Sequence, residues 1–544
     1  MDFCVLIEIF VKNCYDVKKL FKNKKKRGFE MLSIIKSAAL LGIDSYPVEV
    51  EVDLSNGLPA FDIVGLPDSA VKESRERVRT AIRNAGFSFP VKRITVNLAP
   101  ADTKKEGAAF DLPIALGILS ACNLFSAEKI EDALITGELS LDGSVRPVNG
   151  VLPMLYDALR RGISVSFVPF ENAEEAALVE GMTVYPVHSV KEIVAHLSGG
   201  TQIAPYHKEG NAFSLTQTDT PDLDFSHVKG QENAKRAMEI AAAGGHNILL
   251  IGPPGSGKTM LAKRLPTILP DLSFEESIEI TKIYSVAGLL KEKNSLVRTR
   301  PFRSPHHTIS ASALTGGGRI PRPGEISLAH HGVLFLDELP HFSKGAIEAL
   351  REPLEEHRIT ISRVAGSYEF PADFLILGAM NPCPCGFFPD RSRCNCTPVQ
   401  IQNYLNRLSR PILERFDICV EAAPVTFAEL EDQTTENEDS AVIRSRVEKA
   451  VKIQAARFQG TDIRNNSRMG QKEIQRFCKL KEPEKRFARR VYEARGISAR
   501  GYHRVLKTAR TIADLAGEEW IQKEHLSEAF GYRALEERIW GQKH

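Results

Sequence analysis

The sequence has almost no surplus of charge and no long apolar run. Its 544 residues include 71 Lys and Arg against 69 Asp and Glu, a formal net charge of +2. A globally basic surface is therefore excluded, and any contact with a polyanion must come from local clusters of basic side chains. No apolar run reaches the roughly 18 residues that span a bilayer. Since the amino terminus also lacks the pattern of a secretory signal, we expect a cytoplasmic protein with no membrane partner.

Cysteine is too scarce for a disulfide scaffold, with nine in the whole chain. Four of them nevertheless fall within fourteen residues, in a C-x-C-x8-C-x-C pattern formed by Cys383, Cys385, Cys394 and Cys396. In a reducing compartment such clustering favours metal over disulfides, and four thiolates can close a tetrahedral structural Zn²⁺ site. The spacing is tighter than that of the usual zinc knuckles. Free or redox-active thiols and cysteines that only pack in the interior remain the alternatives.

The length allows three or four domains, and a hydrophobic content of 43% is enough for a buried core. Shifts in composition place the boundaries. We expect a leader at 1–30, an αβ block at 31–200, a polar, turn-rich linker at 201–224, a core at 225–424 and a helical segment at 425–544.

The leader at 1–30 is rich in lysine, with seven basic residues between Lys18 and Arg27. A nucleic-acid-binding arm and a solvated tail are two interpretations. A third is that the natural start is Met31, because codons for Lys26, Arg27 and Gly28 can form a ribosome-binding site. The leader carries eight basic and four acidic residues, so a chain beginning at Met31 would have a formal charge of −2.

The front block alternates between strand and helix patterns. Polar and apolar residues alternate over 48–52 and 93–98, which predicts two strands. Between them, 68–85 has the pattern of a helix capped by Asp68 or Ser69. A second helix is expected after Phe110-Asp111-Leu112-Pro113.

A phosphate-binding loop is the strongest motif of the chain. The apolar run 247–251 predicts a buried strand, and a helix is expected from Met260. Between them lie Gly252, Pro253, Pro254, Gly255, Ser256, Gly257, Lys258 and Thr259. In such a loop, glycines let backbone N–H groups approach phosphate, the lysine contacts the β- and γ-phosphates, and the threonine ligates Mg²⁺. The sequence therefore predicts ATP binding with Mg²⁺ as cofactor.

Two further apolar strands end in polar residues suited to the same site. The run 332–336 leads into Asp337 and Glu338, and the run 374–380 leads into Asn381. We expect Asp337 to hold Mg²⁺ and Glu338 to polarise the attacking water. Asn381 is placed as a polar sensor of the γ-phosphate.

Longer motifs carry a resemblance to a known family. They are GLPDSAVKESRERVRTAIRNAG (65–86), GAAFDLPIALGIL (107–119), SLAHHGVLFLDELPHF (327–342), ALREPLEEHRITISRVAG (349–366), NPCPCG (381–386), RPILERFDI (410–418) and SARGYHRVLKTARTIADLAG (498–517). Together they resemble the magnesium-chelatase-like ComM/YifB family of AAA+ ATPases, from Met31 nearly to the carboxyl terminus. The resemblance implies an α/β fold with a degenerate Lon-protease-like N-terminal domain, an AAA+ P-loop αβα core and a C-terminal helical lid.

The resemblance also implies roles for single residues and for the assembly. Arg415 is similar to the arginine finger offered to a neighbouring subunit's ATP. Arg500 is similar to the second sensor, with Arg504 as a weaker candidate. An ATP hydrolase that forms a homo-hexamer and acts on single-stranded or branched DNA is implied, as a helicase or branch-migration motor in recombination and natural transformation. A chelatase-type motor and an ATP-switched scaffold that does not act on DNA are the alternatives.

Two pore-facing hairpins are also implied, at 300–329 and 358–363. The second alternates, with Ile359 and Ile361 on one face and Thr360 and Ser362 on the other. Seven basic residues could contact phosphates there: Arg303, His306, His307, Arg319, Arg322, Arg358 and Arg363. Ordinary solvated hairpins are the alternative.

The front block resembles the Lon protease domain, whose chemistry needs a serine nucleophile and a lysine base. The positions that correspond to these two residues are Ala109 and Leu152 in this sequence. We therefore expect no peptidase activity and a structural role.

Overall fold

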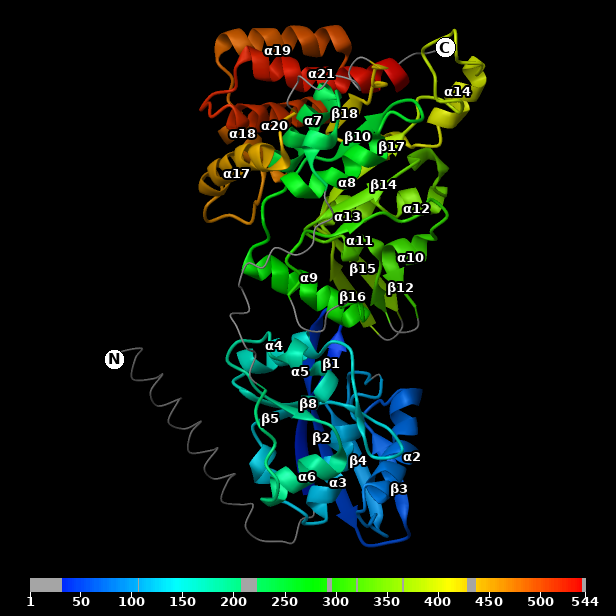
Figure 1. Ribbon diagram of the computed structural model, residues 1–544, viewed down its shortest axis with the longest axis vertical. Coiled ribbons are helices and arrows are strands. Elements are labelled where there is room, and N and C mark those ends of the chain that lie inside the picture. The colour runs from blue at the N-terminus through cyan, green and yellow to red at the C-terminus, as the bar shows by residue number, and fades with distance from the viewer. Residues whose placement is uncertain are drawn as a thin grey trace, which may run out of the picture. The chain divides into compact units, whose positions relative to one another are not determined.

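The computed structural model describes residues 32–105, 107–206, 223–290, 296–318, 321–363, 366–427 and 437–540. They divide into two compact units, one formed mainly by 32–206 and the other mainly by 223–540 (Figure 1). The predicted leader at 1–30 and most of the predicted linker lie outside the described residues. In the part of the chain that is described, no helix has both the length and the hydropathy needed to cross a bilayer.

The first unit is built on a mixed seven-stranded sheet in the order β3-β4-β2-β1-β5-β8-β9. Both predicted strands are confirmed, since 48–52 lies within β2 and 93–98 within β4. The side chains of Val48, Val50 and Val52 are fully buried, as the alternation requires. The strands are β1 (Leu32–Leu41), β2 (Asp44–Ser55), β3 (Ala60–Val64), β4 (Arg93–Ala99), β5 (Ala133–Ile135), β8 (Val165–Pro169) and β9 (Thr183–Val187), with β6 (Glu138–Leu139) and β7 (Val145–Arg146) as a separate pair.

Two helices of this unit confirm the sequence patterns. Helix α2 (Ser69–Asn84) is capped by Asp68, whose side chain accepts from the Val71 N–H. Helix α3 (Asp111–Ala121) is buried along its whole length, which explains why its sequence is apolar on all sides. The other helices are α4 (Val151–Arg160), α5 (Ala173–Ala176) and α6 (Val190–Ser198), with short 3₁₀ turns η1 (Ala127–Ile130) and η2 (Phe170–Asn172).

The second unit contains a five-stranded, fully parallel sheet in the order β11-β14-β17-β10-β18. The strands are β11 (Phe302–Arg303), β14 (Val333–Leu336), β17 (Leu375–Met380), β10 (Ile248–Ile251) and β18 (Ile418–Glu421). Every residue of β10, β14 and β17 is buried, as expected for a parallel sheet covered on both faces. Because the strands are parallel, all their carboxyl ends lie at one edge, called here the carboxyl edge, and all their amino ends at the opposite, amino edge.

The carboxy-terminal helices share one apolar core with the helices beside β10. Residues of α7 such as Ile240, of α17 such as Val447 and of α21 such as Leu526 belong to a single buried cluster. The helices on this side are α7 (Glu232–Gly244), α8 (Lys258–Ile268), α17 (Ser440–Arg457), α18 (Gln471–Phe477), α19 (Glu482–Arg495), α20 (Ala499–Leu515) and α21 (Lys523–Trp540), with η3 (Phe225–His227) and η5 (Asn466–Arg468). Helices α17 and α20 pack directly on α7, and α21 packs on α20 and β18 (Figure 1).

The remaining elements surround the two hairpins. Strand β15 (Arg358–Arg363) pairs with β16 (Gly366–Pro371), and β12 (Gly316–Gly317) pairs with β13 (Arg322–Pro323). Ile359 and Ile361 are buried whereas Thr360 and Ser362 are exposed, so the predicted alternation is correct. The adjoining helices are α9 (Phe274–Ala287), α10 (Ala311–Thr315), α11 (Glu325–Leu328), η4 (Leu339–His341), α12 (Lys344–Glu348), α13 (Arg351–Glu356), α14 (Pro398–Leu405) and α15 (Arg410–Leu413).

Candidate functional site

A glycine-rich loop joins strand β10, which lies between β17 and β18, to helix α8. The helix begins at Lys258, two residues earlier than the sequence predicted. Gly255 and Gly257 have φ values of 75° and 81°, in the left-handed region that favours glycine. A Cβ on Gly252 would lie 2.2 Å from the carbonyl oxygen of Ala422, so this position also needs glycine. The loop brings the amino terminus of α8 to the carboxyl edge of the sheet, where helix dipole and backbone N–H groups attract phosphate.

Lys258 lies folded over this loop. Its Nζ donates to the carbonyl oxygens of Gly252 and Pro253, both at 2.8 Å, and to Asn381 Oδ1 at 3.2 Å. Burial lowers the pKa of Lys258, and the two acidic residues that end β14 oppose that shift. Phosphate oxygens are stronger acceptors for an ammonium group than neutral carbonyls are. The lysine and Asn381 are therefore already at the place where a nucleotide's phosphates would bind.

Thr259 and Asp337 fit the ligand set of a magnesium ion. Thr259 Oγ1 donates to Asp337 Oδ2 at 2.7 Å, although the residues come from different elements. In an octahedral Mg²⁺ site with bonds of about 2.1 Å, neighbouring oxygens lie about 3 Å apart. The two oxygens therefore match two adjacent positions, and Mg²⁺ usually takes the remaining ones from phosphates and water.

Glu338 follows Asp337 and lies close to two histidines. Its Oε2 lies 3.5 Å from His307 Nδ1 and 3.4 Å from His341 Nδ1. The carboxylate is 54% exposed, so water can reach it. The sequence assigned His307 to phosphate contacts in a hairpin and gave no role to His341. Pairing of β11 with β14 brings His307 here, and nothing in the spacing along the chain indicates it.

Gln231 is a second residue that the sequence did not single out. It has a φ of 62° immediately before α7, and its side-chain amide donates to the carbonyl oxygens of Ser256, at 3.0 Å, and Ala423. Gln231 thus fastens the start of α7 to the phosphate loop and to the segment after β18.

Arg415 and Arg500 lie together at the amino edge of the sheet. Both guanidinium groups donate to Glu355 Oε1, Arg500 at 2.9 Å. Arg415 precedes β18, which runs parallel to β10, whereas the phosphate loop follows β10. The structure therefore brings the two predicted arginines together and separates both from the phosphate loop of the same chain.

These arginines line a pocket with a volume of 310 Å³ that also contains His503, Arg504 and Lys507. Arg504, the weaker candidate for the second sensor, lies 3.7 Å from Asp417. Burial alone would raise the pKa of Asp417, but a hydrogen bond from His246 and the nearby cations hold it at about 2. Asp417 is thus a fixed negative charge within a basic pocket.

The four clustered cysteines are brought together as predicted. All four are free thiols, and each Sγ lies within 4.8 Å of the others. A disulfide needs an S–S distance of about 2.05 Å, so the sulfur atoms are not bonded to one another. The arrangement is compatible with a tetrahedral zinc site, because these separations suit four thiolates around one ion.

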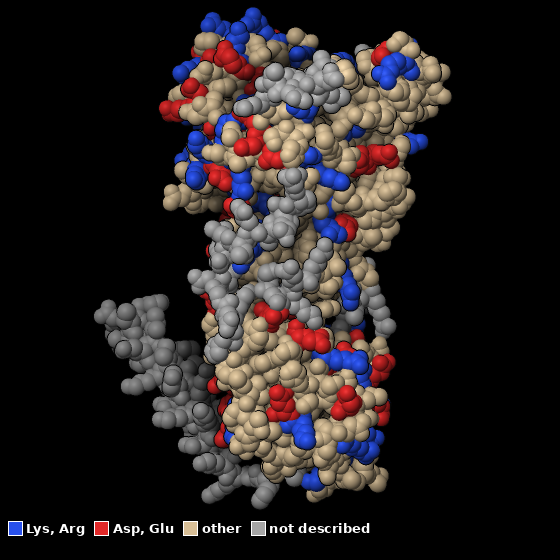
Figure 2. All heavy atoms as spheres, in the orientation of Figure 1, with Lys and Arg blue, Asp and Glu red and all other residues tan. Residues whose placement is uncertain are grey.

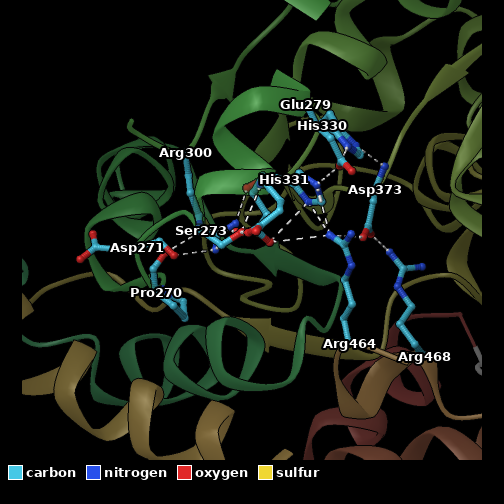
Figure 3. Close-up of polar contacts among 12 residues, drawn as sticks. Pro270, Asp271, Ser273, Glu279, Arg300, His330, His331, Asp373, Arg464 and Arg468 are labelled. Atoms are coloured by element: carbon cyan, nitrogen blue, oxygen red, sulfur yellow. Dashed lines mark hydrogen bonds and ion pairs between the residues drawn. The ribbon is translucent and has the colours of Figure 1, made fainter. Parts of the chain in front are cut away.

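A second group of metal-ligand residue types, at the amino edge, has the wrong protonation for a metal. Glu279 Oε2 lies 3.2 Å from His330 Nε2 and 2.8 Å from His331 Nε2 (Figure 3). His330 Nδ1, however, accepts from the Asp373 N–H at 3.0 Å. A neutral imidazole that accepts at Nδ1 carries its proton on Nε2, which then donates to the glutamate and has no lone pair for a metal. Burial lowers the pKa of His330, which favours this neutral form.

The same group continues into the carboxy-terminal helices. Arg468, at the end of η5, donates to Asp373 and contacts His357 (Figure 3 labels the first pair). Arg464 lies 3.7 Å from Glu276, which also pairs with Arg300 at 3.2 Å. We call these residues the edge network. It joins α9, the amino ends of β14 and β17, and the segment between α17 and α18.

The predicted phosphate contacts of the hairpins have a mixed outcome. Arg303 makes two hydrogen bonds to Glu325, both 2.7 Å long, and is therefore already neutralised within the chain. Arg358 is 53% exposed and only loosely paired, 3.6 Å from Glu369. Arg319 and the side chain of Arg363 lie outside what the structure describes. Figure 2 shows basic and acidic atoms interspersed on the visible face, as the near-zero net charge predicts.

The positions that correspond to the Lon dyad lie in ordinary packing environments. Ala109 is in the turn before α3, and its carbonyl oxygen accepts from the Gly137 N–H. Leu152 is fully buried at the start of α4. Neither residue offers a nucleophile or a base.

A parallel sheet, a glycine-rich loop after one inner strand (β10) and acidic residues at the end of another (β14) define the class of P-loop nucleotide-binding proteins. Comparison with family models agrees with this architecture. "Magnesium chelatase, subunit ChlI" matches residues 224–430, "Subunit ChlI of Mg-chelatase" matches 50–172, and "Magnesium chelatase, subunit ChlI C-terminal" matches 437–533.

Individual relatives match over nearly the full length. Competence protein ComM of Haemophilus influenzae is 44% identical over 505 residues, which cover 93% of this chain and 98% of that protein. The protein YifB of Salmonella typhimurium is 43% identical and covers 93% and 97%. Lon protease 2 of Bacillus subtilis is 26% identical over 216 residues, 36% of this chain and 38% of that protein. The chain belongs to the ComM/YifB family of magnesium-chelatase-like AAA+ ATPases, for which ATP and Mg²⁺ are the implied cofactors.

Proposed function

We propose that the protein is a Mg²⁺-dependent ATP hydrolase that assembles into a homo-hexameric ring and moves DNA, as a helicase or branch-migration motor in recombination and natural transformation. The match to a relative named for competence supports the process, and the matches to magnesium chelatase models support the type of motor.

One observation supports the proposed assembly into a ring. Arg415 and Arg500 lie at the amino edge, on the far side of the sheet from Lys258. A guanidinium group stabilises the charge that develops on a transferring phosphoryl group only where it reaches that group. In the proposed mechanism these arginines act on the nucleotide of a neighbouring copy, so hydrolysis depends on assembly.

The residues at the carboxyl edge of the sheet would supply the reaction chemistry. Mg²⁺, held by Thr259 and Asp337, would neutralise charge on the β- and γ-phosphates. Glu338 orients the attacking water and accepts its proton, with His307 and His341 fixing the carboxylate. Lys258 and Asn381, which are hydrogen-bonded to each other, would contact the terminal phosphate.

The proposed DNA contacts are local rather than global. Arg322 and Arg358 are exposed on the two hairpins, and the formal net charge of the whole chain is only +2. Backbone phosphates of a single strand can be bound by a few such side chains repeated around a ring.

The test is ATPase activity with and without DNA. DNA should stimulate hydrolysis several-fold in the wild type. The Glu338→Gln variant should lose hydrolysis by about 100-fold or more while still binding nucleotide, because only proton transfer to the carboxylate is removed. Unwinding of a branched DNA then decides whether the ATPase is a motor, and absence of DNA stimulation would contradict the proposal.

The alternative is a chelatase-type motor or an ATP-switched scaffold that does not act on DNA. The three matches to magnesium chelatase models favour it as the second candidate. Both would hydrolyse or bind ATP without a response to DNA, and the chelatase would need a separate catalytic subunit.

Two further assignments complete the proposal. The Lon-like unit is structural and has no peptidase activity, so the protein should not degrade casein in the presence of ATP. The cysteine cluster holds a structural Zn²⁺, which makes this ion the third cofactor beside ATP and Mg²⁺.

A further inference from the structure

We infer that a Zn²⁺ ion bound by the cysteine cluster stabilises the phosphate loop, so that loss of the metal weakens ATP binding. This inference rests on the proposed zinc and ATP sites and names a link between them. It is carried by the spacing of the sulfur atoms, by the structure of the loop between them and by one close contact with the phosphate loop.

The sulfur atoms have the spacing of a tetrahedral thiolate site. Cys383 Sγ lies 3.4 Å from Cys385 Sγ and 3.8 Å from Cys394 Sγ, and the latter two are 3.6 Å apart. Four sulfurs at about 2.3 Å from one Zn²⁺ would be separated by about 3.8 Å. Unbonded thiols gain little from such close approach, whereas one divalent cation stabilises all four as thiolates.

The loop around the cluster is organised to hold it. The N–H groups of Gly386 and Phe388 donate to Cys383 Sγ at 3.2 and 3.4 Å. Such N–H···S bonds support thiolate charge and orient metal ligands. Between the two cysteine pairs, Asp390 accepts from the Ser392 N–H at 2.9 Å and from the Cys394 N–H at 2.8 Å through its main-chain oxygen. These two hydrogen bonds hold the turn that brings the second cysteine pair toward the first.

The loop that carries the cysteines also packs against the phosphate loop. Gly386 has a φ of 88°, and a Cβ at this position would lie 2.3 Å from Pro254 Cδ. Asn381, two residues before the first cysteine, accepts from Lys258 Nζ at 3.2 Å. The cluster is therefore tied to the phosphate site on both sides, through Asn381 and through Gly386. A metal that fixes the loop fixes Pro254 and the partner of Lys258 as well.

The first arm of the test measures the metal in the purified full-length protein. Elemental analysis should find one Zn²⁺ per chain, and replacement by Co²⁺ should give the visible bands of tetrahedral thiolate ligation. A mercurial thiol reagent should release the zinc. Cys383→Ser should lose the metal whereas Cys122→Ser, in the first unit, should retain it. A zinc-free wild type whose clustered thiols react as fast as Cys122 would overturn the metal site, whether or not the variants fold.

The second arm separates the contact from the metal. Gly386→Ala should keep its zinc but bind a fluorescent ATP analogue about tenfold more weakly, because the added methyl overpacks against Pro254. Gly162→Ala is the matched control, with a φ of 87° and nothing within 4 Å of its Cβ, and should bind like the wild type. Wild-type affinity in Gly386→Ala, or in zinc-stripped wild type, would overturn the link. A wild type with zinc that binds no ATP would instead contradict the proposed function.

Discussion

At the scale of single residues, we expect the arrangement around Glu338 to set the rate of the proposed hydrolysis. The backbone of Glu338 is in the left-handed region, with a φ of 51°. Among the described residues, the ion-pair partners of its carboxylate are His307 and His341. A half-exposed glutamate without such partners would sample several rotamers. The two imidazoles reduce this freedom, so they act as positioning residues.

We therefore expect His307→Ala to lower kcat for ATP by about tenfold with KM nearly unchanged, because orientation of the base is lost while the phosphate contacts remain. Steady-state kinetics over a range of ATP concentrations measures both constants. His188→Ala, an exposed histidine of the first unit, is the control. A rise in KM with kcat unchanged would contradict a positioning role.

At the scale of elements, the edge network fastens the carboxy-terminal helices to the sheet. Burial, and then the Arg468 cation, lower the pKa of His357 to about 4. An unfolded histidine has a pKa of about 6.5. Between pH 6.5 and 4 the unfolded chain therefore binds a proton that the folded chain does not, so stability falls as the pH falls through this window. Buried His330, whose pKa is also lowered, contributes in the same direction.

Between pH 7 and 4 the free energy of unfolding should fall by about 2 kcal/mol less in His357→Asn than in the wild type. The part of the fall that is due to His330 should remain. Asparagine is chosen because His357 has a φ of 57°, which asparagine tolerates better than most residues. Denaturant titration followed by tryptophan fluorescence measures it, since both tryptophans, Trp520 and Trp540, lie in the second unit. An equal loss of stability on acidification in variant and wild type would contradict the assignment.

At the scale of the whole molecule, the proposed function makes a single chain incomplete as an enzyme, because Arg415 and Arg500 lie away from the phosphate loop of their own chain. Lys258→Ala and Arg415→Ala should each be inactive alone. The first variant loses the lysine that contacts phosphate, and the second no longer offers a guanidinium group to the ATP of the neighbouring subunit. Mixed in equal amounts, they should regain roughly a quarter of wild-type activity, because roughly one interface in four then joins an intact loop to an intact arginine. Mixing Lys258→Ala with Lys258→Ala, Arg415→Ala is the control and should stay inactive. Activity in Arg415→Ala alone would show that the arginine is not required.

Much of the nucleotide site could be predicted from the sequence, because its motifs are local. The order of glycines, Lys258 and Thr259 follows from eight consecutive residues, and the buried strands before them follow from apolar runs. Even there, the start of α8 was misplaced by two residues, since helix ends depend on hydrogen bonds that composition does not show. His307 and Gln231 were missed as site residues. His307 reaches the site because β11 pairs with β14, and Gln231 reaches it from a turn that precedes the phosphate loop in the sequence.

The sequence by itself determined the family, the phosphate loop, the acidic pair that follows β14 and the existence of a cysteine cluster. Only the tertiary structure decided which edge of the sheet each group occupies. It placed Arg415 and Arg500 opposite the phosphate loop, neutralised Arg303 with Glu325 and packed Gly386 on Pro254. The reason is physical: a motif is written in consecutive residues, whereas proximity between strands depends on their order and direction in the sheet, which pairing and packing decide together.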